Sequence, residues 1–146
     1  MKLLLGKLGV ILIGLAIFSY AEVWGADWVF LAAESDGTLW WIDIQGITVH
    51  PNKILTMWVK KIKAKDILEI IKSGTKINPS ELEKMVSERA YERSFMEIDC
   101  IKKTFNNLQI FNYDSKGVLK SGVTESNIKN IPPGSVVETI YKAVCK

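Results

Sequence analysis

The chain has 146 residues and a formal net charge of +3; 48% of its residues are hydrophobic and 24% are charged. This composition is ordinary for a globular protein and excludes a low-complexity chain. Without the first 25 residues the formal charge falls to +2, which excludes the strongly basic surface of a nucleic-acid-binding protein.

The N-terminal segment has the pattern of a secretory signal peptide over residues 1–25. Its start carries two lysines, the uncharged apolar run 8–18 follows, and small residues come next. As a helix, a run of this length covers about half of the ~30 Å hydrocarbon core, so we expect no stable transmembrane anchor. Small residues allow cleavage after Ala21 or after Gly25. The mature protein is then expected to be exported.

Residues 26–146 are expected to form a single domain, because no repeat, linker or low-complexity stretch divides them. The first half indicates two β-hairpins. Residues 28–33 and 38–44 are rich in β-branched and aromatic residues and flank an Asp-Gly turn signal. Residues 46–49 and 54–62 form a second pair of strands around a Pro-Asn turn.

The middle of the domain changes to helical spacing. Apolar residues in 67–71 predict a short helix that ends near Gly74, and Asn78 begins a second helix. The second helix is expected to place one apolar stripe on the sheet. The residues at helical spacing that form this stripe are Leu82, Met85, Val86 and Arg89.

Strands return in the last third of the chain, over 94–102 and 108–113, and residues 118–121 pair back across a turn. Ser135 and Glu138 have the spacing of a capping box, which predicts a final helix. The whole order predicts an α+β fold. We expect a mainly antiparallel β-sheet, two or three helices packed on one face, and one disulfide.

The disulfide is predicted between Cys100 and Cys145, the only two cysteines of the chain. In an exported protein an even cysteine count indicates a disulfide, whereas in the cytosol the same pair would be two free buried thiols. The bond would join a strand to the end of the last helix.

Four short segments occur in a fixed order along the domain: Trp28 before Asp36-Gly37 with Trp41-Ile42-Asp43 after it, Met57-Trp58-Val59, Glu97-Ile98-Asp99-Cys100, and Ile131-Pro132-Pro133-Gly134-Ser135 leading to Val144-Cys145. In their order and in the placing of both cysteines they resemble the surface-adhesin protein E family of exported Gram-negative proteins. The resemblance implies a mainly antiparallel sheet with helical packing, a disulfide, and adhesion to host extracellular-matrix and serum proteins. Well-described members look like outer-membrane lipoproteins, whereas no cysteine precedes Cys100 here.

We predict no catalytic, metal or cofactor site, and therefore no enzyme. His50 is the single histidine and falls in a predicted turn, where solvent exposure is expected. The carboxylates of Asp36, Asp43 and Asp99 fall in turns or strands, where hydrogen-bonding roles are common. The glycines fall in turns, so no phosphate-binding loop is predicted.

A run of four residues is the candidate partner-binding site: Trp58, Lys60, Lys61 and Lys63. A tryptophan beside lysines supplies an anchor and steers an acidic partner, either a protein or an acidic glycan. Lysines at the end of a strand also prevent edge-to-edge pairing of sheets, and this alternative remains open.

Two functions fit these features. The first is an exported non-catalytic binding protein, adhesin-like, that contacts extracellular-matrix or serum proteins or other envelope macromolecules. The alternative is a periplasmic structural or accessory protein with only bacterial partners. The sequence leaves open whether the mature protein stays in the periplasm or reaches the cell surface.

Overall fold

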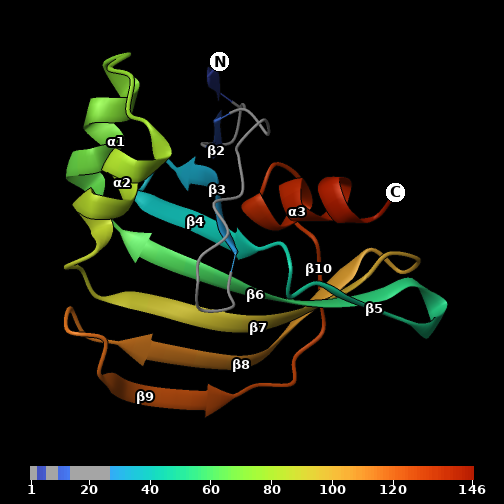
Figure 1. The fold of residues 1–146 in the computed structure, drawn as a ribbon. Coiled ribbons are helices and arrows are strands. Elements are labelled where there is room, and N and C mark those ends of the chain that lie inside the picture. The colour runs from blue at the N-terminus through green and yellow to red at the C-terminus, as the bar shows by residue number, and fades with distance from the viewer. Residues whose placement is uncertain (1–2, 6–9, 14–26) are drawn as a thin grey trace.

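The structure is a computed structural model that describes residues 3–5, 10–13 and 27–146. The described residues form one ten-stranded sheet and three α-helices (Figure 1). The strands are β1 (Leu3–Leu5), β2 (Val10–Ile13), β3 (Trp28–Glu34), β4 (Thr38–Asp43), β5 (Thr48–His50), β6 (Ile54–Lys63), β7 (Tyr91–Asp99), β8 (Thr104–Tyr113), β9 (Leu119–Thr124) and β10 (Lys129–Asn130). The helices are η1 (Pro51–Lys53, a 3₁₀ turn), α1 (Lys65–Lys72), α2 (Pro79–Val86) and α3 (Val136–Val144).

Every strand pair in the sheet is antiparallel. The main order is β1-β2-β3-β4-β6-β7-β8, with β5 paired to the first residues of β6, and β9 and β10 paired to different parts of β8. The predicted α+β class with a mainly antiparallel sheet and a disulfide is therefore confirmed. Among the described residues no helix is long and apolar enough to cross a membrane.

Strands β1 and β2 fall within the segment predicted to be a signal peptide. Strand β2 lies along the outer edge of β3, with Ile11 opposite Ala33, so the apolar segment continues the sheet. Both predicted cleavage points, after Ala21 and after Gly25, lie outside the described residues. The signal peptide stays a prediction, since pairing in the uncleaved chain does not test removal.

The hairpin of β3 and β4 follows its turn signal closely. Gly37 has a φ of +93°, a conformation that glycine adopts without strain. The space is also restricted, because a Cβ at this position would lie 2.8 Å from the Cα of Lys65. The turn therefore requires glycine for two reasons: the positive φ, and the lack of space for a Cβ next to the start of α1.

The core has two parts on opposite faces of the sheet. Alternate residues of β6 turn to opposite sides, so Val59 belongs to one part and Ile62 to the other. On one side, Met57, Val59 and Met96 pack with Val137 and Ile140 of α3. On the other, Trp41 and Ile62 pack with Ile67 and Leu68 of α1 and Leu82 of α2.

The helices consequently divide between the two faces. Helices α1 and α2 share one face, which agrees with the prediction of two or three helices on one face, while α3 covers the opposite face near the other end of the strands (Figure 1). We refer to these as the α1/α2 face and the α3 face.

Local helix signals place the helix ends well, with one error. The side chain of Asn78 caps α2 and that of Ser135 caps α3, as predicted. The prediction that Arg89 continues the stripe of α2 is wrong, because the helix ends at Val86. The long cationic side chain instead reaches Asp66 on α1.

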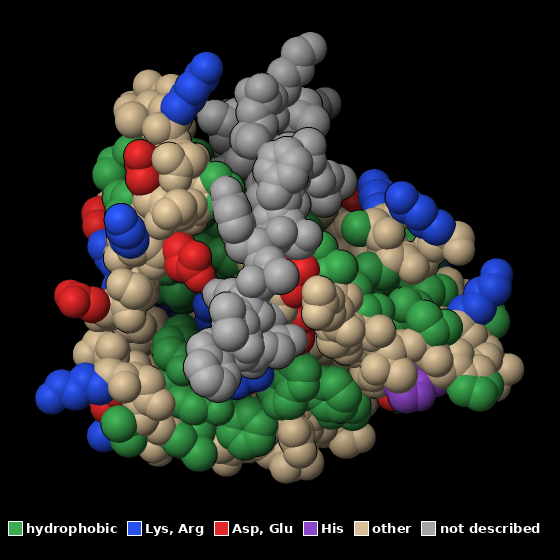
Figure 2. Space-filling model, viewed as in Figure 1, with side chains coloured by type: hydrophobic (Ala, Val, Ile, Leu, Met, Phe, Trp, Pro, Cys, Tyr) green, Lys and Arg blue, Asp and Glu red, His purple; other side chains and the backbone are tan. Residues whose placement is uncertain are grey.

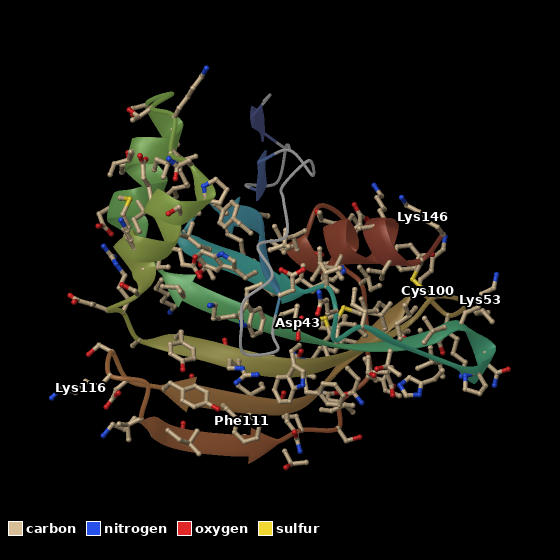
Figure 3. The ribbon with its side chains drawn as sticks, in the orientation of Figure 1. Asp43, Lys53, Cys100, Phe111, Lys116 and Lys146 are labelled. Atoms are coloured by element: carbon tan, nitrogen blue, oxygen red, sulfur yellow. A yellow bond between two sulfur atoms is a disulfide. The ribbon has the colours of Figure 1, made fainter. Side chains whose placement is uncertain are left out.

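The predicted Cys100–Cys145 disulfide is confirmed. It joins the end of β7 to the end of α3, with a Cα–Cα distance of 5.6 Å (Figure 3). Both cysteines pack against the core part beneath α3, and the hydroxyl of Tyr141 donates a hydrogen bond to the carbonyl of Cys100 at 3.4 Å. The bond holds the C-terminal helix against the sheet.

Removal of this bond should lower stability clearly. Closing a sequence separation of 45 residues is worth up to about 4 kcal/mol through the entropy of the unfolded chain. The double variant Cys100→Ser/Cys145→Ser should therefore unfold at a markedly lower temperature than the oxidised parent. The reduced parent is the matched control, and equal melting temperatures of parent and variant under oxidising conditions would contradict the role assigned to the bond.

Candidate functional site

The four residues of the predicted binding site lie on both faces of the sheet. Strand β6 has no bulge between Trp58 and Lys63, so its side chains alternate strictly. Trp58 and Lys60 point to the α1/α2 face, whereas Lys61 and Lys63 point to the α3 face. The structure thus brings together two members of the predicted set and separates the other two from them.

On the α1/α2 face, Trp58 and Lys60 are part of a larger set of half-buried rings and cations, which we call the aromatic–cation array. The ring of Trp58 stacks on Phe95 at 5.0 Å and on Phe111 at 6.1 Å between ring centroids. The guanidinium of Arg93 lies 5.0 Å from the ring of Trp58. The members of the array are Trp28, Trp58, Lys60, Arg93, Phe95 and Phe111.

Both cations of this array lie over tryptophan rings. Arg93 contacts Trp28 at 5.5 Å as well as Trp58, and the amine of Lys60 lies 5.0 Å from the ring centre of Trp28. Such contacts are each worth about 0.5–2 kcal/mol, depending on how far water is excluded. They hold the two cations in place on the surface of the sheet.

Cross-strand register assembles the array from four separate strands. Lys60 is opposite Arg93, and Arg93 is opposite Phe111 on β8. The ring of Phe111 lies over Gly122 of β9, where a Cβ would be only 3.0 Å from the ring. Glycine at this position leaves room for the ring, so that Phe111 extends the aromatic surface to the edge of the sheet.

Four members of the array were not predicted as site residues: Trp28, Arg93, Phe95 and Phe111. The sequence held a signal for two of them. Tyr91, Arg93 and Phe95 occupy every second position, as side chains on one face of a β-strand do. The sequence does not give the register between β6 and β7. This register places Arg93 beside Lys60 and Trp58 rather than on the α3 face. Within the described residues the Nε of Arg93 is buried without a hydrogen-bond partner, and its guanidinium lies beside the rings of Trp28 and Trp58.

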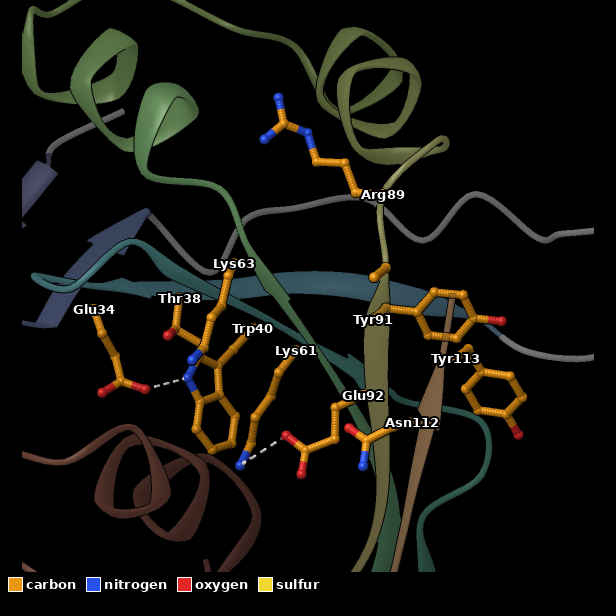
Figure 4. A pocket seen from close by; sticks show the side chains of 11 residues that line it. Glu34, Thr38, Trp40, Lys61, Lys63, Arg89, Tyr91, Glu92, Asn112 and Tyr113 are labelled. Carbon is orange, nitrogen blue, oxygen red and sulfur yellow. Dashed lines mark hydrogen bonds and ion pairs between the residues drawn. The ribbon is translucent and has the colours of Figure 1, made fainter. Parts of the chain in front are cut away.

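The α3 face carries the other two lysines beside an open hollow of about 750 Å³ (Figure 4). The amine of Lys61 lies 4.2 Å from the ring centre of Trp40 and 3.8 Å from the carboxylate of Glu92. The indole N–H of Trp40 donates to the carboxylate of Glu34. Glu34 and Glu92 line this hollow together with Lys61 and Lys63, so carboxylates offset part of its positive charge.

A two-pronged ion pair lies beside this hollow, between Arg89 and Asp66. The guanidinium of Arg89 donates hydrogen bonds to both carboxylate oxygens of Asp66, at 2.7 and 2.6 Å. These hydrogen bonds lower the pKa of the Asp66 carboxyl and raise that of the Arg89 guanidinium. The pair links α1 to the segment that enters β7.

The ion pair should make a small part of the stability dependent on pH. Because the pKa of Asp66 is lowered by folding, the contribution is complete above the carboxyl's unfolded pKa of about 4 and is lost as the pH falls through the lower folded value. Asp66→Asn should therefore melt below the parent at neutral pH, and the gap should close in acid. A gap that widens in acid would contradict this sign; Glu69→Gln on the same helix is the control.

The residues considered for catalysis have structural hydrogen bonds. Nε2 of His50 lies 2.8 Å from the hydroxyl of Thr56 on an exposed strand. The carboxylate of Asp43 accepts the N–H groups of Asp27 and Gly46. Asp36 and Asp99 likewise accept backbone N–H groups within their own turns. In the part of the chain that the structure describes, no three His, Cys, Asp or Glu side chains are grouped so that they could hold a metal ion.

A disulfide-linked α+β domain with an aromatic and basic sheet surface has the features of a binding protein. Residues 28–146 match the sequence model of the family described as surface-adhesin protein E, and the chain belongs to this family. The resemblance found in the sequence is therefore confirmed, and the family makes this chain an adhesin-like surface protein with a suggested non-enzymatic role. Neither a curated protein nor a solved structure gives a significant match.

Proposed function

We propose that the protein is an exported, non-catalytic adhesin that binds an acidic macromolecule through the aromatic–cation array. The partner classes are extracellular-matrix and serum proteins, acidic glycans and other envelope macromolecules. The observation that carries the proposal is the stack of Trp58 with Phe95 and Phe111, flanked by Arg93 and Lys60 on one surface.

The array combines the two properties that a binding surface needs. Half-buried aromatic rings present apolar area with little side-chain entropy left to lose, which is why tryptophan is enriched among residues that dominate binding energy. The cations attract an acidic partner over a distance limited by salt, about 8 Å in physiological solution. In the hollow on the α3 face, Glu34 and Glu92 reduce the attraction of the lysines for an acidic partner.

Substitutions on the two faces test which surface binds. Trp58→Ala should weaken binding by about 30-fold, the loss typical of a dominant anchor. Lys60→Gln should cause a smaller loss that shrinks as salt rises, because it removes only charge. Binding would be measured on immobilised extracellular-matrix proteins, acidic glycans and envelope extracts, at two salt concentrations.

The matched control is the double variant Lys61→Gln/Lys63→Gln, which removes charge from the same strand on the opposite face. It should bind as the parent does. Trp58→Phe keeps a ring in the stack and should retain most of the affinity, which separates loss of the contact from loss of the fold. A larger loss in the Lys61/Lys63 variant than in Lys60→Gln would move the site to the α3 face.

Export is a second part of the proposal, and it predicts the mature N-terminus. Removal of the apolar segment should leave a chain that begins at Glu22 or Ala26. Intact mass of the exported protein decides between them, and cell fractionation with external protease shows whether it is displayed or retained in the periplasm. Recovery of Met1 in the mature envelope fraction would contradict cleavage.

A further inference from the structure

One end of the sheet carries exposed aliphatic side chains next to lysines. Val49 on β5 is 72% exposed and Ile101, in the turn between β7 and β8, is 65% exposed. Lys53, Lys102 and Lys103 are exposed on the same two turns. We call these five residues the lysine tip.

The two turns lie side by side. The backbone N–H of Cys100 donates to the carbonyl of Lys53 at 3.1 Å, which joins the turn before β6 to the turn after β7. Lys53 and Lys146 are at this end of the molecule together with Cys100, while Lys116 is at the opposite end (Figure 3). In Figure 2, lysine and arginine side chains border hydrophobic ones at the corresponding right-hand end.

The positive charge of the lysine tip is not cancelled by ion pairs. Among the described residues, no ion pair includes Lys53, Lys102 or Lys103. The nearest carboxylate along the chain, Asp99, accepts the backbone N–H groups of Ile101 and Lys102 at 3.0 and 2.9 Å and keeps its negative charge. Asp99 and Glu97 line a hollow with Lys102, so the three lysines outnumber the carboxylates beside them by one.

Two of these lysines have a backbone conformation that is unusual for lysine. Lys53 and Lys103 have φ values of +55° and +54°, in the left-handed region that favours glycine and asparagine. Among the described non-glycine residues, Asn52 alone shares this conformation, and it lies next to Lys53 in the turn before β6. Local stability therefore favours other residue types at both positions and does not account for the lysines.

We propose that the lysine tip docks the protein on a lipid bilayer with anionic headgroups. Val49 and Ile101 enter the headgroup layer, and the three lysines contact lipid phosphates. Aliphatic side chains that are two-thirds exposed gain from contact with acyl chains and gain little from a hydrated polysaccharide. This favours a membrane over an acidic glycan as the occupant. The tip is separate from Trp58 on the array, so docking leaves the proposed partner surface accessible.

Vesicle sedimentation tests the proposal directly. The exported protein, with its N-terminus checked by intact mass, should bind vesicles of phosphatidylcholine mixed with phosphatidylglycerol and bind pure phosphatidylcholine far less. Each lysine near an anionic surface raises partitioning about fivefold, so Lys53→Asn/Lys102→Gln/Lys103→Asn should bind about 100-fold more weakly. Asparagine suits the left-handed backbone, so the variant keeps its fold.

A second variant separates insertion from charge. Val49→Thr/Ile101→Ser should also bind the mixed vesicles more weakly, by about tenfold, because burial of each CH₂ group in lipid is favourable. The matched control, Lys116→Gln/Val118→Ser, changes an exposed lysine and a 52% exposed valine at the opposite end and should bind as the parent does. Parent-like vesicle binding by both tip variants, or binding to heparin beads with none to mixed vesicles, would overturn the proposal. Neither result would affect the Trp58 test.

Discussion

Strand β6 imposes the constraint on which the rest of the structure depends. It is paired along both edges, with β4 and β5 on one side and β7 on the other. Its alternate residues pack against α3 on one face and against α1 and α2 on the other. A strand held in this way cannot shift by one residue, because the shift would turn every side chain to the opposite face and bring Lys60 into the place of Val59 in the core.

The same constraint decides where charge can be displayed. Val59 is fully buried between Trp58 and Lys60, so this half-buried pair is carried by a strand whose other face is core. Pairing with β7 and β8 then brings Arg93 and Phe111 beside this pair. The aromatic–cation array is thus a consequence of sheet register, and its rigidity comes from the core on the reverse side of the same strands.

Local signals in the sequence were sufficient to predict most of the helices and strands. Turn chemistry at Gly37 and capping at Asn78 and Ser135 depend on neighbouring residues, so their strands and helices could be predicted. The face chosen by α3 could not, because an apolar stripe fits either side of an apolar sheet. The candidate site was predicted only in part for the same reason. Alternation already separates Lys60 from Lys61, but Arg93 lies beside Lys60 only through the register between strands that are distant in sequence.

One residue of the array, Arg93, is not the residue that would give the domain the greatest stability. Burial of the Nε of Arg93 without a hydrogen-bond partner among the described residues costs free energy, which contact with two tryptophan rings offsets. An apolar residue opposite Phe111 would pack there without the penalty. Proteins tolerate such local conflicts mainly at functional sites, where the rest of the fold holds them in place. The buried Nε of Arg93, held beside two tryptophan rings, is therefore a further indication of a binding surface.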